Sequence, residues 1–144
     1  MSNESTTVQH NVSAALARRM IDAGRAHAEA EGKAFTIAIV DASGVLKAME
    51  RMDGAPLVSI QVAQDKAYTA VGFGIPSGAW HDFIKDDPPL AAGATAGIDR
   101  LVIFGGGFPI TVDGNVVGAV GVSGGHYSED AAVAEAALAA VAAT

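Results

Sequence analysis

Cysteine is absent from this chain, aromatic residues make up only 6% of it, and no basic cluster occurs. Without cysteine there are no disulfides, thiolate nucleophiles, zinc–cysteine sites or cysteine-ligated haem iron. The net charge of −7 argues against nucleic acid and anionic membrane surfaces, since both attract basic patches. The composition therefore predicts no nucleic-acid and no membrane partner.

Long hydrophobic runs and a secretory signal are also missing. No stretch reaches the roughly 18–20 apolar residues of a membrane-spanning helix. Residues 1–7 are polar and lack the basic start and apolar run of a secretory signal. We therefore expect a cytoplasmic protein with a flexible tail at residues 1–9 and a single domain over residues 10–144.

Several segments show apolar residues at three- and four-residue steps, which is the helical pattern. In the first of them Leu16, Met20 and His27 share one face, and Gly32 ends the helix. Ser128 is expected to cap the last one. The expected helices cover residues 11–31, 57–73, 77–84 and 128–142, and residues 85–100 are expected to form a long irregular loop.

Short apolar runs bounded by turn residues predict strands at residues 35–41, 45–51, 101–104, 108–112 and 116–123. The first is apolar on both faces, which is typical of a central strand. Asp113-Gly114 predicts a two-residue hairpin turn, and one face of the last strand is small enough for a ligand or a backbone to approach. We predict an α+β fold with about five antiparallel strands flanked by helices, of the profilin/PAS-like kind.

Three stretches of sequence, in a fixed order, resemble a known family. They are residues 39–44 (IVDASG), then 50–56 (ERMDGAP) running into 63–70 (AQDKAYTA), and finally 105–110 (GGGFPI) followed by Asp113-Gly114 and 118–124 (GAVGVSG). In this order they resemble the GlcG/HbpS-like haem-binding family, which includes the C-terminal domain of PduO-type adenosyltransferases.

The resemblance implies an antiparallel sheet flanked by helices, assembly into dimers or larger rings, and a small-ligand site that some members use for haem. It also implies a setting in catabolism. The sequence departs from the family pattern at residues 86–89 (DDPP) and at His126-Tyr127. These departures leave room for a ligand other than the usual one.

Two cationic side chains in the shared motifs are candidate ligand-binding residues. Arg51, with Asp53 two residues on, could clamp the carboxylates of haem or of a small acid, because guanidinium binds carboxylate in a two-pronged way. The alternative is a structural Arg51–Asp53 pair that fixes the loop. Lys66 could present its ammonium to an anionic ligand, and its alternative is a solvated surface lysine.

The glycine turn at residues 105–109 is the third candidate for ligand binding. Gly105, Gly106 and Gly107, followed by Phe108-Pro109, allow backbone N–H groups to approach an anion closely. No Gly-Lys-Ser/Thr follows, so this is not a P-loop. The alternative is a β-bulge that bends the edge of the sheet, and we expect a bulge that also lines the site.

Histidine is the strongest haem-iron ligand that this composition offers. His27 is the candidate haem ligand by position, and its alternative is a half-buried histidine stabilised by the helix dipole. His81 and His126 adjoin aromatic residues in or near loops, where they could line a pocket. The spacing of the histidines and acids gives no metal motif.

Three functions follow as hypotheses. The first is a small-ligand-binding accessory protein of catabolism, with haem or a small carboxylic acid as ligand. The second is a cofactor-free isomerase, lyase or hydrolase, with His81, His126, Tyr127 and Asp53 as candidates for acid–base catalysis and residues 85–100 as a lid. The third is a structural or stress-linked homo-oligomer, because small-residue strands and helices suit symmetric packing.

Overall fold

The sheet is built around a strand that is buried on both faces. This strand, β1 (Thr36–Asp41), pairs antiparallel with β2 (Leu46–Arg51) on one side and with β4 (Asn115–Ser123) on the other. The edge strand β3 (Gly107–Val112) completes the order β2-β1-β4-β3. The computed structural model, which describes residues 4–143, thus confirms the α+β class and the central strand but has a four-stranded sheet instead of the expected five.

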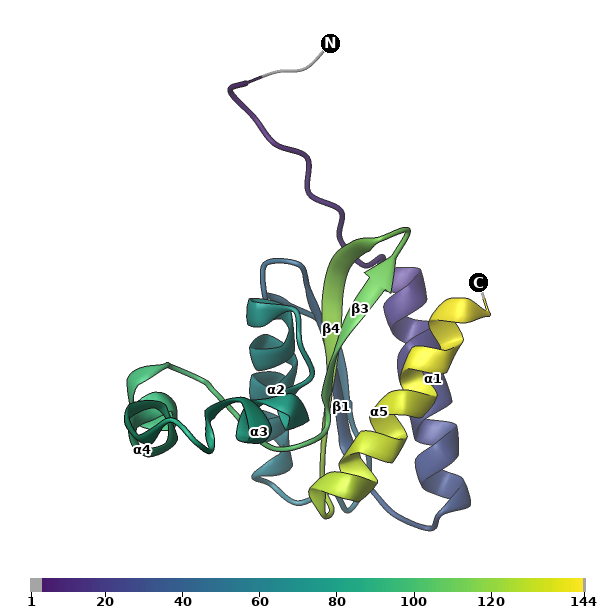
Figure 1. Ribbon diagram of the computed structural model, residues 1–144. Helices are drawn as coiled ribbons and strands as arrows, with labels where there is room; N and C mark the ends of the chain where they lie inside the picture. Colours follow the sequence, from purple (N-terminus) through teal and green to yellow (C-terminus); the bar gives the residue numbers. More distant parts are fainter. Residues whose placement is uncertain (1–3, 144) are drawn as a thin grey trace.

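Helices cover both faces of this sheet (Figure 1). The helices α1 (Ala14–Ala30) and α5 (Tyr127–Ala142) pack on one face, where Ile37 and Ile39 lie in the main core. The helix α2 (Ser59–Phe73) packs on the other face, over Val40 and Ala119. Ile37, Ile39 and Ala119 have no exposed surface, so the three layers are in close contact.

The small-residue face of β4 allows α2 to lie directly on the sheet. A Cβ added to Gly121 would lie only 2.6 Å from the backbone nitrogen of Ala67 and would also collide with Ala63. The close approach expected for this face is therefore made by the backbone of α2. The predicted hairpin turn is present as well, with φ values of 50° at Asp113 and 81° at Gly114, the signs that a type I′ turn requires.

The helix α5 begins at an N-cap that the sequence did not predict. The side chain of His126, and not that of Ser128, caps the helix, since its Nδ1 accepts from the Ser128 backbone N–H at 3.2 Å. The Glu129 carboxylate in turn accepts from the His126 backbone N–H at 3.0 Å, which completes a capping box. The expectation failed because a neutral imidazole nitrogen accepts a hydrogen bond as a hydroxyl does.

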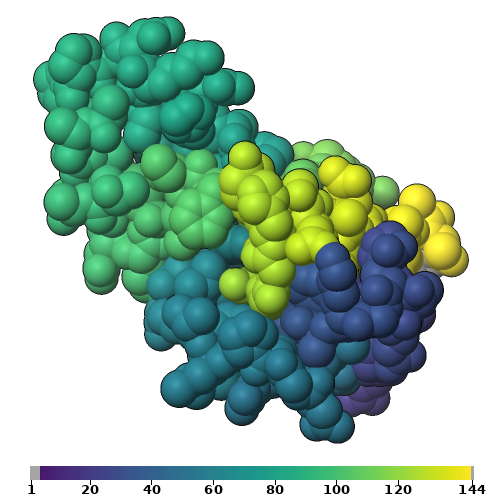
Figure 2. Space-filling model, turned by 90° about the horizontal axis from the view of Figure 1, so that it is seen from below, coloured from purple at the N-terminus to yellow at the C-terminus, as the bar shows by residue number. Residues whose placement is uncertain are grey.

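The segment expected to be a long loop is mostly helical and forms an arm. The arm comprises a 3₁₀ turn η1 (Ser77–Ala79), α3 (Trp80–Ile84) and α4 (Pro88–Gly97), and Figure 2 shows it projecting from the rest of the molecule. The Asp87 side chain caps α4, and the prolines follow at the first helical positions, where proline is tolerated. Residues 86–89, which were expected to lie in an irregular loop, therefore form the start of a helix.

The expected strand at residues 101–104 does not form. Its backbone bonds to side chains instead of to a neighbouring strand: Thr69 Oγ1 accepts from Val102 N–H at 3.0 Å, and Ser77 Oγ donates to the Phe104 carbonyl at 2.7 Å. These hydrogen bonds satisfy backbone groups of residues 102 and 104, and pairing with β4 as a strand begins only at Gly107.

Residues ahead of α1 are partly tied to the β1–β2 hairpin. Asn11 Oδ1 accepts from the Ala42 backbone N–H at 2.9 Å, and Ser43 Oγ donates to Gln9 at 3.2 Å. The part of the predicted tail at residues 1–3 lies outside the described residues. Among the helices of residues 4–143, none combines the length and apolar character needed to cross a membrane. The comparison with profilin and PAS domains stays a prediction.

Candidate functional site

The arm and the start of α5 enclose a hollow of about 490 Å³, which we call the aromatic hollow. It brings together several residues that the sequence singled out, from segments far apart in the chain. Its lining residues are Gly78, His81, Asp82, Ile103, Phe104, Gly105 and Tyr127. In Figure 2 the green segment ahead of β3 lies beside the yellow-green start of α5.

Three elements place the side chains of the aromatic hollow. His81 and Asp82 come from α3, Phe104 from the segment before β3, and Tyr127 from the first turn of α5. The rings of Phe104 and Tyr127 lie 6.5 Å apart and are 45% and 51% exposed as residues. The hollow therefore has two accessible aromatic walls and one histidine among its lining residues.

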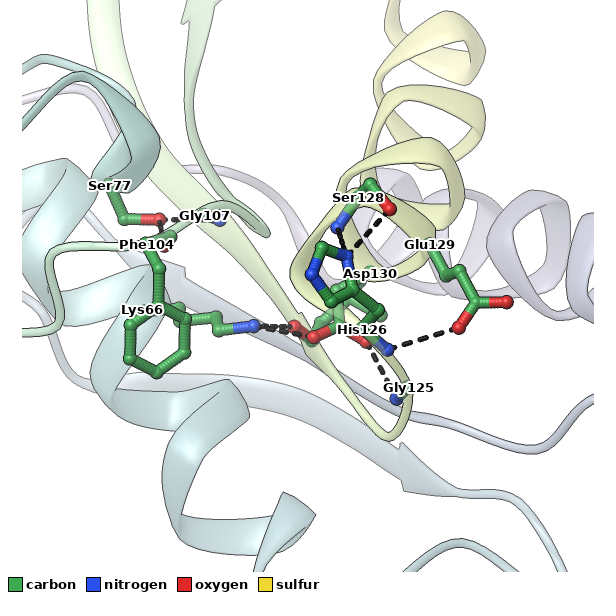
Figure 3. Close-up of polar contacts among 10 residues, drawn as sticks. Lys66, Ser77, Phe104, Gly107, Gly125, His126, Ser128, Glu129 and Asp130 are labelled. Atoms are coloured by element: carbon green, nitrogen blue, oxygen red, sulfur yellow. Dashed lines mark hydrogen bonds and ion pairs between the residues drawn. The ribbon is translucent and has the colours of Figure 1, made fainter. Parts of the chain in front are cut away.

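A buried ion pair lies beneath this hollow (Figure 3). Lys66 Nζ, from α2, donates to Asp130 Oδ2 at 2.7 Å and to the Val122 carbonyl at 2.9 Å. Neither side chain is more than 3% exposed. Burial lowers the pKa of Lys66 from its ordinary value, although the hydrogen bond that Lys66 donates to Asp130 opposes this shift. The pair thus joins α2, β4 and α5 across the sheet.

Lys66 is not a solvated surface lysine, which was the alternative to ligand binding. Its ammonium has no exposed surface and is occupied by protein acceptors, and the ring of Phe104 lies over it with a centroid distance of 5.1 Å. Binding of an anionic ligand by Lys66 stays a prediction. In this structure such a ligand would have to displace Phe104 or Asp130.

The glycine turn is the covering layer above Lys66. Gly106 has a φ of 126°, and a Cβ there would lie 2.7 Å from the Val122 carbonyl oxygen and 2.8 Å from Lys66 Nζ. Gly107 lies against the backbone of Lys66, and its N–H donates to Ser77 Oγ at 2.9 Å. Glycine is therefore required for close packing. The register shift of β3 lies between Ile110 and Thr111, not at the glycines.

The residues of the glycine turn lie at different depths relative to the aromatic hollow. Gly105 lines the aromatic hollow, while Gly106 and Gly107 are buried below it. Pro109 lies in the edge strand β3, a position that tolerates the missing N–H. Of the predicted ligand-binding residues of the turn, Gly105 alone is thus among those lining the hollow.

Arg51 and Asp53 lie on a different part of the surface. The Arg51 guanidinium donates to the Ala55 carbonyl from Nε at 3.3 Å and from Nη2 at 3.1 Å. In the described residues it is not paired with Asp53, so the alternative of an Arg51–Asp53 pair is wrong. Arg51 fixes the loop after β2 through a carbonyl instead. Neither residue lines the aromatic hollow.

His27 lines a second hollow, of about 340 Å³, which we call the α1 hollow. Its ring is half-buried, and Lys33 forms an ion pair there with Glu129. The lining residues are His27, Glu31, Lys33, Phe35, Ser128, Glu129, Ala132 and Val133. Both hollows therefore adjoin the first turns of α5. His126 caps this helix and lines neither of them.

Asp130, Phe104 and Ser77 are site residues that the sequence analysis missed. Asp130 lies in the first turn of α5, where the helix dipole is sufficient reason for an acidic side chain, and the expected strand concealed Phe104. Lys66 and Asp130 are 64 residues apart, so no local spacing could pair them. No group of three or more histidine and acidic side chains suited to a metal ion occurs within residues 4–143.

Comparisons with known proteins agree with this architecture. The family model described as "Haem degrading protein HbpS-like" matches residues 12–139. An uncharacterized 15.0 kDa protein from the dhaT-dhaS intergenic region of Citrobacter freundii is 35% identical over 127 residues, covering 88% of this chain and 89% of its own. The protein GlcG of Escherichia coli is 34% identical over 110 residues, covering 75% and 78% of the two chains.

A solved structure extends the comparison to a ligand-bound protein. The crystal structure of a PduOC–haem complex superposes with a TM-score of 0.84 at 30% identity, covering 90% of this chain and 94% of its own. The family match spans nearly the whole domain, and the superposition shows that the overall fold is shared. This chain belongs to the HbpS-like family.

Proposed function

We propose that this protein is a small-ligand-binding accessory protein that takes haem in the aromatic hollow, with His81 as the iron ligand. The observation that carries the proposal is the convergence of His81, Phe104 and Tyr127 on one hollow of about 490 Å³. The family description and the haem complex of a relative support haem as the ligand.

The chemistry of the hollow fits a flat, mostly apolar ligand with a metal at its centre. Phe104 and Tyr127 offer exposed ring surface, and Gly78 and Gly105 line the hollow without side chains. His81 is a strong ligand for haem iron, and the phenol of Tyr127 is a second ligand type. Bound haem supplies a redox-active iron whose potential depends on that axial ligand.

The residues of the chain would bind and orient this ligand. His81 lies on α3 and Tyr127 on α5, so both elements contribute to one site. Ser77 fixes the backbone of Phe104 by its 2.7 Å hydrogen bond, which holds the aromatic wall in place. A catabolic role for the bound form follows from the family resemblance and belongs to this proposal.

Haem titration of the purified chain tests the proposal. We expect a Soret shift that saturates at micromolar haem for the wild type and an at least tenfold weaker affinity for His81→Ala. His27→Ala is the matched control, because His27 also lines a hollow beside α5. It should bind haem as the wild type does.

Two results would contradict the proposal in different ways. The absence of any Soret shift in the wild type would remove haem as the ligand. Loss of binding in His27→Ala with His81→Ala unaffected would move the site to the α1 hollow. Tyr127→Phe separates the ligand types, because it changes the spectrum only when the phenol oxygen binds iron.

Acid–base catalysis on a small substrate is the second candidate function. It is favoured by one observation, the placement of His81 and Tyr127 in the same hollow. His126 is a weaker candidate than the sequence indicated, since its Nδ1 is occupied as the cap of α5. Turnover of a small substrate that falls at least tenfold in His81→Ala, with no haem present, would favour this function over the first.

A further inference from the structure

Phe104 separates the aromatic hollow from a buried cation. Its ring lines the hollow on one side and lies over Lys66 Nζ on the other, with the centroid at 5.1 Å. Phe104 is 45% exposed, whereas Lys66 has no exposed surface. Figure 3 shows the ring of Phe104 beside the side chain of Lys66.

The ammonium below the ring has donor capacity left over. An ammonium carries three N–H donors. Two of them have acceptors, the Val122 carbonyl at 2.9 Å and Asp130 Oδ2 at 2.7 Å. The face of Phe104 is the remaining neighbour and interacts with the cation through its π electrons. A small carboxylate in place of the ring would find a donor of opposite charge.

The ring is held over the lysine by its backbone. Ser77 Oγ donates to the Phe104 carbonyl at 2.7 Å and accepts from the Gly107 N–H at 2.9 Å, so one hydroxyl fixes both sides of the turn. Ser77 has no exposed surface, which protects these bonds from water. Phe104 therefore covers Lys66 in the folded chain and does not swing freely with the arm.

We propose that Phe104 sets the chemical class of the ligand: it shields Lys66, so that the aromatic hollow takes a flat apolar ligand and rejects small carboxylates. A carboxylate entering the hollow as it stands would lose water without gaining an ion pair, because Lys66 is covered. Lys85, whose ion pair with Asp82 spans 3.2 Å, is exposed to solvent, where such pairs contribute little. This inference deepens the proposed function and decides between its two ligand classes.

Truncating the ring tests the shield by a gain of binding. Phe104→Ala should bind acetate at least tenfold more tightly than the wild type, measured by titration at constant ionic strength. Acetamide has nearly the same shape and no charge, and it should show no gain. Phe104→Leu keeps an apolar cover over Lys66 and should bind acetate as weakly as the wild type does. Haem affinity should fall in Phe104→Ala, because one aromatic wall is lost.

Reactivity of the lysine gives an independent measurement. A small amine-modifying reagent followed by mass spectrometry should leave Lys66 unmodified in the folded wild type while it modifies exposed Lys33 and Lys47. Phe104→Ala should raise the rate at Lys66 at least tenfold. Phe104→Val serves as the second truncation if the alanine variant does not fold.

The outcomes separate this inference from the proposed function. Equal acetate affinity and equal Lys66 reactivity in the wild type and in the folded truncation variant would overturn the shield, whatever haem does. Acetate binding by the wild type at the strength of Phe104→Ala would overturn it as well. If haem fails to bind the wild type but acetate binding still appears on truncation, the shield stands and the haem proposal falls.

Discussion

The body and the arm of this protein are stabilised in different ways. In the body, formed by the sheet with α1, α2 and α5, the side chains of Ile37, Ile39 and Val120 have no exposed surface. In the arm only a small cluster is buried, and α4 contributes Ala94 alone to it. We conclude that packing over long sequence separations stabilises the body, while a small cluster around Trp80 and the Asp87 cap stabilise the arm. The arm should therefore open without unfolding the body.

The largest loss of stability is expected from breaking the buried ion pair of the body, Lys66–Asp130. Lys66→Met leaves the Asp130 carboxylate buried without its cation and should lower the free energy of unfolding by about 3–5 kcal/mol. Chemical denaturation of the wild type and the variant measures this loss. Lys66→Met/Asp130→Asn is the control, because asparagine can still accept from the Gly125 N–H that now bonds to Asp130. A double variant no more stable than the single one would show that burial of an unpaired charge is not the cause.

The next effect compares one core residue of each region. Ile39→Ala should cost about 2–5 kcal/mol of global stability, because the cavity lies in the body. Trp80→Ala removes a side chain that is only 3% exposed, but its loss should be confined to the arm. Hydrogen exchange should then show fast amides in residues 77–97 and unchanged protection in β1 and β4. Equal loss of protection in the sheet would show that the two regions unfold as one unit.

Smaller changes of the same kind in both regions sharpen the comparison. Asp87→Ala removes the cap of α4, and His126→Ala removes the cap of α5. Each should cost about 1 kcal/mol, the first only in local opening of the arm and the second in global unfolding. The replacements Asp87→Asn and His126→Asn keep a capping side chain and should restore most of the loss. The prediction fails if Asp87→Ala shifts the global transition as much as His126→Ala does.

The smallest effect is a dependence on pH. Burial lowers the pKa of Lys66 below its ordinary value of 10.5, so in the alkaline range the unfolded chain binds more protons at this group than the folded chain. The contribution of Lys66 to stability should therefore rise with pH through the folded pKa and level off near 10.5. Denaturation of the wild type and of Lys66→Met/Asp130→Asn across this range isolates the contribution. A difference that falls with pH would show that the shift has the opposite sign.

The body could be predicted from the sequence because its signals are periodic. The continuous apolar run in residues 37–40 reflects burial on both faces of the sheet, and the helical spacing of Leu16 and Met20 reflects burial of one face of α1. The Asp113-Gly114 turn was predictable because Asp-Gly is a preferred pair where both residues adopt positive φ values. The arm lacks a periodic apolar pattern. Residues 86–89 contain both a helix cap, Asp87, and two prolines, and the prolines predicted an irregular loop.

The site was predictable only in part, for a related reason. The sequence singled out His81, Gly105 and Tyr127, and the structure places them in one hollow. It could not pair Lys66 with Asp130 or place Phe104 above them, because those contacts depend on how three separate elements meet. Arg51 shows the converse, since its motif position gave no information on the Ala55 carbonyl that it binds.

The hydroxyl of Ser77 also closes the arm at its base. By bonding to Phe104 and Gly107, it joins the beginning of the arm to the segment that leads from the arm into β3. An insertion closed in this way can change in length or sequence while the strands that it connects keep their register. Changes in the arm should therefore alter the aromatic hollow, which α3 helps to line, without disturbing the pairing of β3 with β4.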